Sequence, residues 1–245
     1  MRKILFTIVV LMGISCPVFA AAPSIDFTSL GSLSTFNGSQ KDTTSVGGIT
    51  IDGFVFSSGT YRTDKGFLWL RNNSLDHGLG YCSSGESCGA VNTTGGGDFN
   101  ELSNEINLEV IRLTLPTGKH WRGLWVSSLD TGGSASNEIG TVYWSNNATQ
   151  NLSSATGASF SHSSLAANEG SIFGLVPTLD VNAKYLFFRA GPNAAGTNND
   201  YTLWGVGVAP IPEPEIYAMI AAGLGMMGFV SRRRKGQAGA ETAAS

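Results

Sequence analysis

Short apolar runs alternate with clusters of glycine, asparagine and serine through most of this 245-residue chain. The runs are rich in β-branched and aromatic residues, as β-strands are, and the clusters have the composition of turns. The clearest runs are Ile49 to Phe56, Tyr185 to Ala190 and Tyr201 to Val208. No apolar stripe with the helical period of about 3.6 residues is sustained between Ala21 and Ala209. The pattern predicts an all-β fold, with a single jelly-roll-like β-sandwich over residues 21–209.

One longer stretch, from Glu101 to Leu115, changes its alternation midway. Its apolar residues occupy alternate positions up to Val110, and the series resumes at Ile111 on the opposite parity. A slip of one residue moves every following side chain to the other face of a strand. We therefore expect one long strand that contains a β-bulge.

The N-terminus has the pattern of a secretory signal peptide. Arg2-Lys3 precedes an apolar run from Ile4 to Ile14, and Val18-Phe19-Ala20 places small residues where signal peptidase requires them. The sequence predicts a signal peptide over residues 1–20, removed after Ala20. A lipid-modified Cys16 is the alternative, which Gly13 disfavours because a leucine is expected at that position.

Removal of the signal peptide leaves two cysteines, Cys82 and Cys88. An even, closely spaced pair in an oxidising compartment predicts a disulfide that closes a small loop. A structural zinc site is disfavoured, because the sequence offers no second cysteine pair or histidine cluster to complete four ligands.

The C-terminal region consists of three consecutive parts. Pro212, Glu213 and Pro214 come first, and residues 216–231 carry no charge. A helix over 216–231 would be about 24 Å long at 1.5 Å per residue, somewhat short for the ~30 Å hydrocarbon core of a bilayer. The basic residues that follow the uncharged segment are Arg232, Arg233, Arg234 and Lys235.

These parts predict a transmembrane helix at the end of an exported chain. By the positive-inside rule the basic residues stay in the cytoplasm together with a short tail, residues 236–245. The last apolar run ends at Val208, so the sandwich is expected close to the membrane with little stalk. The two prolines favour an extended backbone that a protease can grip.

The order of these parts over residues 210–235 resembles the PEP-CTERM sorting signal of Gram-negative bacteria. That signal is processed by exosortase, a membrane-embedded cysteine protease or transpeptidase. The resemblance implies export through the Sec system, transient anchoring in the inner membrane, and transfer to the cell surface or extracellular matrix. It implies exosortase as a partner and an association with exopolysaccharide or biofilm. An ordinary C-terminal anchor is the alternative.

The charge balance excludes one class of partner and permits another. Nine basic and 17 acidic residues fall between Ala21 and Glu215. Nucleic-acid binding requires a basic surface and is therefore not expected, whereas a divalent cation or a hydrated polysaccharide is compatible. Asp98, Asn100 and Glu101 offer the oxygen ligands that calcium prefers, so calcium is the one candidate cofactor. A polar turn is the alternative interpretation of these residues.

Two tryptophans are candidates for a glycan-binding platform. An exposed indole ring can stack on a sugar while its N–H bonds a hydroxyl. Trp121 and Trp144 are the best placed of the five tryptophans, because polar residues surround them in the sequence.

The sequence offers little that could support catalysis. Residues 85–89 spell the letters of a nucleophile elbow, but no strand precedes the serine and no helix follows it. Glu101, Glu105 and Glu109 would lie about 13 Å apart along a strand, too far for paired glycosidase acids, and a solvated face is favoured. We expect no catalytic residue.

The leading hypothesis is a non-enzymatic exported protein of the surface or matrix, sorted by exosortase. A carbohydrate-binding or calcium-dependent adhesin module is the alternative, and a polysaccharide hydrolase is less favoured.

Overall fold

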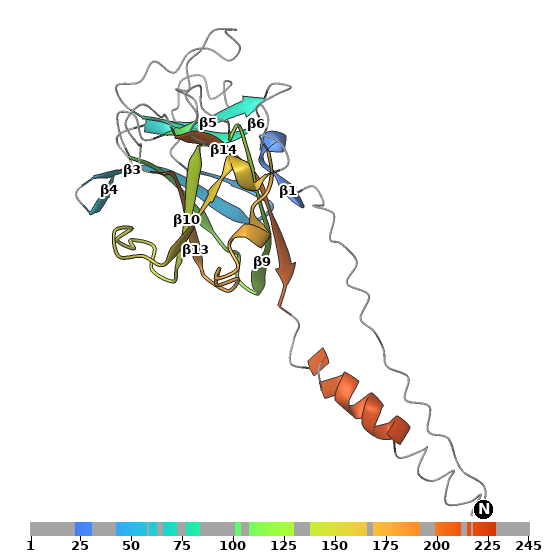
Figure 1. Cartoon of the computed structure of the whole chain (residues 1–245). Coiled ribbons are helices and arrows are strands. Elements are labelled where there is room, and N and C mark those ends of the chain that lie inside the picture. The colour runs from blue at the N-terminus through green and yellow to red at the C-terminus, as the bar shows by residue number, and fades with distance from the viewer. Residues whose placement is uncertain are drawn as a thin grey trace, which may run out of the picture.

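Two antiparallel β-sheets face each other in a computed structural model of the chain, and a helix lies apart from them (Figure 1). The residues that the structure describes are 23–30, 43–57, 59–62, 66–72, 77–83, 101–103, 108–129, 138–165, 169–191, 199–211, 215–216 and 218–228.

The first sheet has the strand order β12-β9-β14-β6-β5, with β1 and β7 paired to β14. Its strands are β1 (Ile25–Asp26), β5 (Gly66–Asn72), β6 (His77–Ser83), β7 (Leu102–Ser103), β9 (Lys119–Ser127), β12 (Gly170–Ser171) and β14 (Asp200–Pro210). The central strand β14 pairs with β9 along most of its length.

The second sheet has the order β11-β10-β13-β8-β3-β2, with β4 paired to β3. Its strands are β2 (Thr43–Val46), β3 (Ile49–Ser57), β4 (Thr60–Arg62), β8 (Glu109–Thr114), β10 (Ile139–Ser145), β11 (Gly157–Ser161) and β13 (Tyr185–Ala190). Three 3-10 turns complete the described sandwich: η1 (Phe27–Leu30), η3 (His162–Ser164) and η4 (Phe173–Leu175).

The inner faces of the two sheets form one hydrophobic core. Tyr81 of β6 is fully buried, and its ring lies against Gly53 of β3 in the opposite sheet. A Cβ on Gly53 would lie 2.3 Å from Cδ2 of Tyr81, so only glycine leaves room for the ring. Close packing of this kind is typical of protein interiors.

The outer face of the second sheet is also covered by the chain. Asp52 and Arg112 are opposite one another in register and form an ion pair of 2.8 Å. Beside them, Tyr61 donates a hydrogen bond to the carbonyl of Gln150 at 2.6 Å, and burial raises the pKa of this hydroxyl. Leu152 is buried with the apolar side chains of this face.

The predicted all-β sandwich is confirmed, and the stretch from Glu101 to Leu115 is a correction. It forms two strands rather than one bulged strand, because β7 pairs with β14 in the first sheet and β8 pairs with β3 and β13 in the second. The change of parity at Ile111 lies within β8. Leu108 and Val110 pack on the outer face of the second sheet, whereas Ile111 and Leu113 face the core between the sheets. The predicted signal peptide, residues 1–20 with its cleavage residue Ala20, lies outside the described residues.

Candidate functional site

The chain is hydrogen-bonded within the sandwich as far as Ile211, where the C-terminal segment begins. At the end of β14, Ala209 pairs with His120 and Pro210 pairs with Lys119 of β9. The N–H of Ile211 then donates to the carbonyl of Gly118 at 2.9 Å. Only three residues separate Ile211 from the next described residue, which is helical.

A helix follows over residues 215–216 and 218–228. It covers most of the predicted transmembrane segment 216–231. Pro212, Glu213 and Pro214 lie outside the described residues, and so does the basic group from Arg232 to Lys235. In the part of the chain that the structure describes, no helix is both long enough and apolar enough to cross a membrane.

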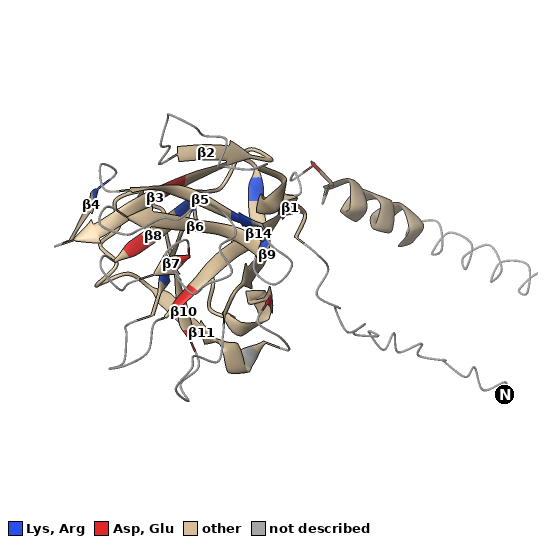
Figure 2. Cartoon of the chain, turned by 90° about the horizontal axis from the view of Figure 1, so that it is seen from above, with Lys and Arg blue, Asp and Glu red and all other residues tan. Residues whose placement is uncertain are grey.

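The helix exposes its apolar side chains. Met219 is 74% exposed and Leu224 is 61% exposed, and a Cβ on Gly225 would meet no atom within 4 Å. Beyond its first residue the helix carries no charge (Figure 2). In a soluble protein such a surface is unusual and marks a site of contact with another apolar phase.

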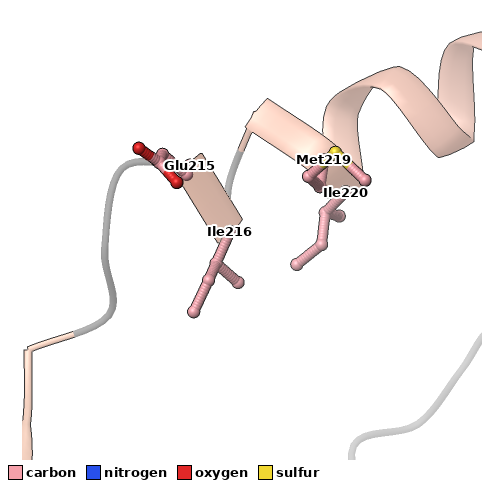
Figure 3. Close-up of a pocket in the computed structure, with 4 residues that line it drawn as sticks. All are labelled: Glu215, Ile216, Met219 and Ile220. Atoms are coloured by element: carbon pink, nitrogen blue, oxygen red, sulfur yellow. The ribbon is translucent and has the colours of Figure 1, made fainter.

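The start of this helix contains a shallow hollow (Figure 3). It is lined by Glu215, Ile216, Met219 and Ile220. One carboxylate on an otherwise apolar surface does not form a pair of acids, and the hollow has the chemistry of a contact surface.

The predicted glycan platform of Trp121 and Trp144 is wrong. Trp121 is 0% exposed and Trp144 is 8% exposed, and both belong to the core between the sheets. The indole N–H of Trp121 donates to the carbonyl of Ala183 at 2.9 Å, so its polar atom is satisfied inside the protein. Polar neighbours in sequence did not predict exposure, because neighbouring residues of a strand point to opposite faces.

Other aromatic residues are partly exposed on the outer face of the first sheet. Phe67 and Trp69 of β5 alternate with the buried core residues Leu68 and Leu70, and their rings lie 5.8 Å apart. Trp69 is paired with Gly80 of β6, which has no side chain to cover it. The run from Phe67 to Leu70 is apolar throughout, so the sequence did not mark its outward side.

A polar cluster adjoins this face. The His77 ring packs edge-on against Trp204 at 4.7 Å, and its Nε2 lies 3.2 Å from Oε2 of Glu169. The Ser127 hydroxyl donates to the same Oε2 at 3.4 Å. The carboxylate thus lies between the serine and the imidazole, which is not the arrangement of a serine–histidine–acid triad. No local pattern marks this cluster, because Ser127, Glu169 and Trp204 are distant from His77 in the chain.

The acidic residues do not form the solvated face that the sequence favoured. Glu101 forms an ion pair with Arg71. Glu109 is 0% exposed, and its Oε2 accepts the N–H of Ser103 at 2.8 Å. These two carboxylates thus have structural partners, and Glu105 lies outside the described residues.

The remaining candidates are only partly described. Of the proposed calcium ligands, Asp98 and Asn100 lie outside the described residues. Among the described residues, no group of three His, Cys, Asp or Glu side chains could hold a metal ion. Cys82 is buried in β6, whereas Cys88 and the rest of residues 85–89 fall outside the description. The calcium site and the disulfide stay predictions.

The comparisons with known proteins identify the C-terminal segment. No curated protein and no solved structure is significantly similar to the chain. Residues 210–235 match the family model of the PEP-CTERM protein-sorting motif. The motif implies exosortase as the processing partner and membrane-linked sorting to the cell surface. The chain therefore carries a PEP-CTERM sorting motif, whose first residues are still part of the β-sandwich.

Proposed function

We propose that this chain is a non-enzymatic protein of the cell surface or extracellular matrix of a Gram-negative bacterium. Exosortase processes it at its C-terminus, and the sandwich then associates with exopolysaccharide or biofilm. The observation that carries this proposal is the sorting motif at residues 210–235.

The exposed helix supports an intermediate that is held in the inner membrane. A Sec signal peptide over residues 1–20 would export the sandwich, and the uncharged segment 216–231 would stay in the bilayer. The basic residues Arg232 to Lys235 would hold the tail on the cytoplasmic side. Such a chain remains anchored until the segment after Ile211 is cut.

The non-enzymatic part of the proposal is supported by the state of the acids. Glu101 and Glu109 are both buried and engaged with protein partners. They stabilise the end of the sandwich where β7 and β8 separate, so they are unsuited to act as a solvent-accessible acid pair.

The test compares the native host with a strain that lacks exosortase. We expect the protein of the native strain in the surface or released fraction, at a mass that lacks the C-terminal segment. Without exosortase it should stay in the inner-membrane fraction with the whole tail. Intact-mass spectrometry of both fractions checks this. Equal release and equal mass in both strains would reduce the motif to an ordinary anchor.

The outer face of the first sheet favours a second candidate function, a carbohydrate-binding or adhesin module. Trp69 and Trp204 are only partly buried there, and the His77–Glu169 pair lies beside Trp204. Aromatic rings next to hydrogen-bonding groups are the chemistry that binds sugars. A glycan array should lose its signals with Trp69→Ala and keep them with Phe54→Leu, a control in the opposite sheet.

A further inference from the structure

The length of chain between the sandwich and the helix limits how far the two can separate. Ile211 is hydrogen-bonded to Gly118 in the sandwich, and Glu215 is already helical. Four residue steps span at most about 14 Å even when fully extended. If the apolar residues from Ile216 onward lie in the hydrocarbon core, Ile211 must lie within that distance of its boundary.

This distance is about twice the thickness of one polar layer of a membrane. Each headgroup layer is about 5–7 Å thick, by the difference between the whole bilayer and its hydrocarbon core. Ile211 of an anchored sandwich therefore lies at most about 7–9 Å above the outer edge of the headgroups. The end of the sandwich that surrounds Gly118 is the end nearest the lipid.

Among the described residues, three chain connections form that end. The turn between β8 and β9, residues 115–118, carries Gly118 and the exposed Thr117. Gly48 in the β2–β3 turn lies beside Pro116, since a Cβ there would be 3.6 Å from its ring. The segment 176–184 is bonded to the same place through the N–H of Leu115, which donates to the carbonyl of Lys184 at 2.8 Å. We name residues 47–48, 115–119 and 176–184 the proximal end.

The described charges of the proximal end are few. Lys119 is partly exposed and pairs in register with Pro210. The ammonium group of Lys184 donates to the carbonyl of Leu115 at 2.8 Å, and Asp180 is the acidic residue of this end. Two cations and one anion contrast with the excess of acidic residues over the whole exported domain. A headgroup layer that contains anionic lipid can approach this end without net repulsion.

We propose that the proximal end rests on the headgroups of the membrane's outer surface while the tail is still anchored. The inference rests on the proposed function, since it requires the helix to be inserted. The short tether, rather than a specific lipid pocket, holds the two surfaces together. The processing enzyme must then reach the segment after Ile211 from the side, between the sandwich and the lipid.

The experiment uses the mature chain, residues 21–245, reconstituted in vesicles of phosphatidylethanolamine and phosphatidylglycerol. A fluorophore is attached at Thr117→Cys, or at Thr60→Cys as the matched control. Both threonines are exposed, and Thr60 lies at the opposite end of β3, where it pairs with Ser57. Vesicles that carry nitroxide lipid headgroups quench a fluorophore close to the surface. Labelling of the unsubstituted chain sets the background.

We expect several-fold stronger quenching at position 117 than at position 60. A flexible Gly-Ser spacer of about 12 residues after Ile211, with a mean span of about 20 Å, should lower the quenching at 117 toward that at 60. Equal quenching at both positions, in protein that resists alkaline carbonate extraction, would overturn the docking and leave the proposed function intact. Quenching that the spacer does not reduce would also overturn it. If alkaline carbonate extracts the protein from the vesicles, the helix is not inserted, and both proposals are overturned.

Discussion

The sandwich and the C-terminal helix place their apolar residues in opposite environments. In the sandwich, side chains such as Leu113 and Trp121 are fully buried between two sheets. In the helix, Met219 and Leu224 are exposed. The sandwich buries its apolar side chains within itself. The helix has an apolar surface that only a bilayer or another protein can cover. Each region should therefore tolerate changes that the other does not.

The largest expected effect is on processing. Replacing Pro212, Glu213 and Pro214 together by alanine should trap a folded, unprocessed protein in the membrane fraction. The reason is that this segment offers the processing enzyme its grip, while the sandwich ends at Ile211. Fractionation with intact-mass spectrometry measures the trapped form.

The matched control replaces Ser153 and Ser154, which are exposed in the sandwich, by alanine, and this variant should be released normally. If the triple-alanine protein were shortened and released at the usual rate, the segment would have no role in sorting.

The second-largest effect is expected from a charge at the middle of the helix, which should impair membrane insertion and leave the sandwich folded. Leu224→Arg is expected to cost about 3–4 kcal/mol of insertion free energy, because Leu224 lies at the centre of segment 216–231. The sandwich should keep its unfolding temperature. Carbonate extraction measures insertion, and near-ultraviolet circular dichroism measures the fold. Leu224→Ala serves as the control, and an arginine variant as resistant to extraction as this control would refute an inserted helix.

The same glycine substitution should have different effects in the two regions. Gly53→Ala places a Cβ 2.3 Å from an atom of Tyr81, and overpacking of this kind costs about 1–3 kcal/mol of unfolding free energy. Gly225→Ala meets no atom within 4 Å and should leave the sandwich unchanged. Denaturant unfolding of both variants measures the contrast. Equal midpoints would mean that the core accommodates the methyl group.

The smallest expected effect concerns the predicted Cys82–Cys88 disulfide. Closing so short a loop should stabilise the sandwich by about 2 kcal/mol, so Cys88→Ser should lower the unfolding free energy by that amount. The tail should be sorted as before. Alkylation of the mature chain without reductant should leave both cysteines unlabelled by mass. Two labels on freshly exported protein would exclude the bond.

Local sequence was sufficient to predict where several strands begin and end. The run from Tyr185 to Ala190 is strand β13 with the same bounds, and the run from Ile49 to Phe56 is β3 with one further residue. Strand propensity and turn residues act over a few positions, so they are visible without knowledge of the fold.

The face to which a side chain points, and the residues that it contacts, could not be predicted in the same way. Trp121 and Trp144 are in the core while Trp69 is partly exposed, although all three lie in similar strands. The position of Glu109 beside Ser103 depends on how β7 and β8 divide between two sheets. Such contacts join residues whose proximity arises only when the sheets assemble.

The sequence by itself determined the all-β class, several strand bounds and the sorting motif at residues 210–235. All of these depend on the order and type of neighbouring residues. Only the tertiary structure decided which aromatic rings face outward, which acids are buried, and that Ile211 is bonded to Gly118 at the start of the motif. The physical reason is that burial and pairing are set by distant strands, which no local pattern encodes.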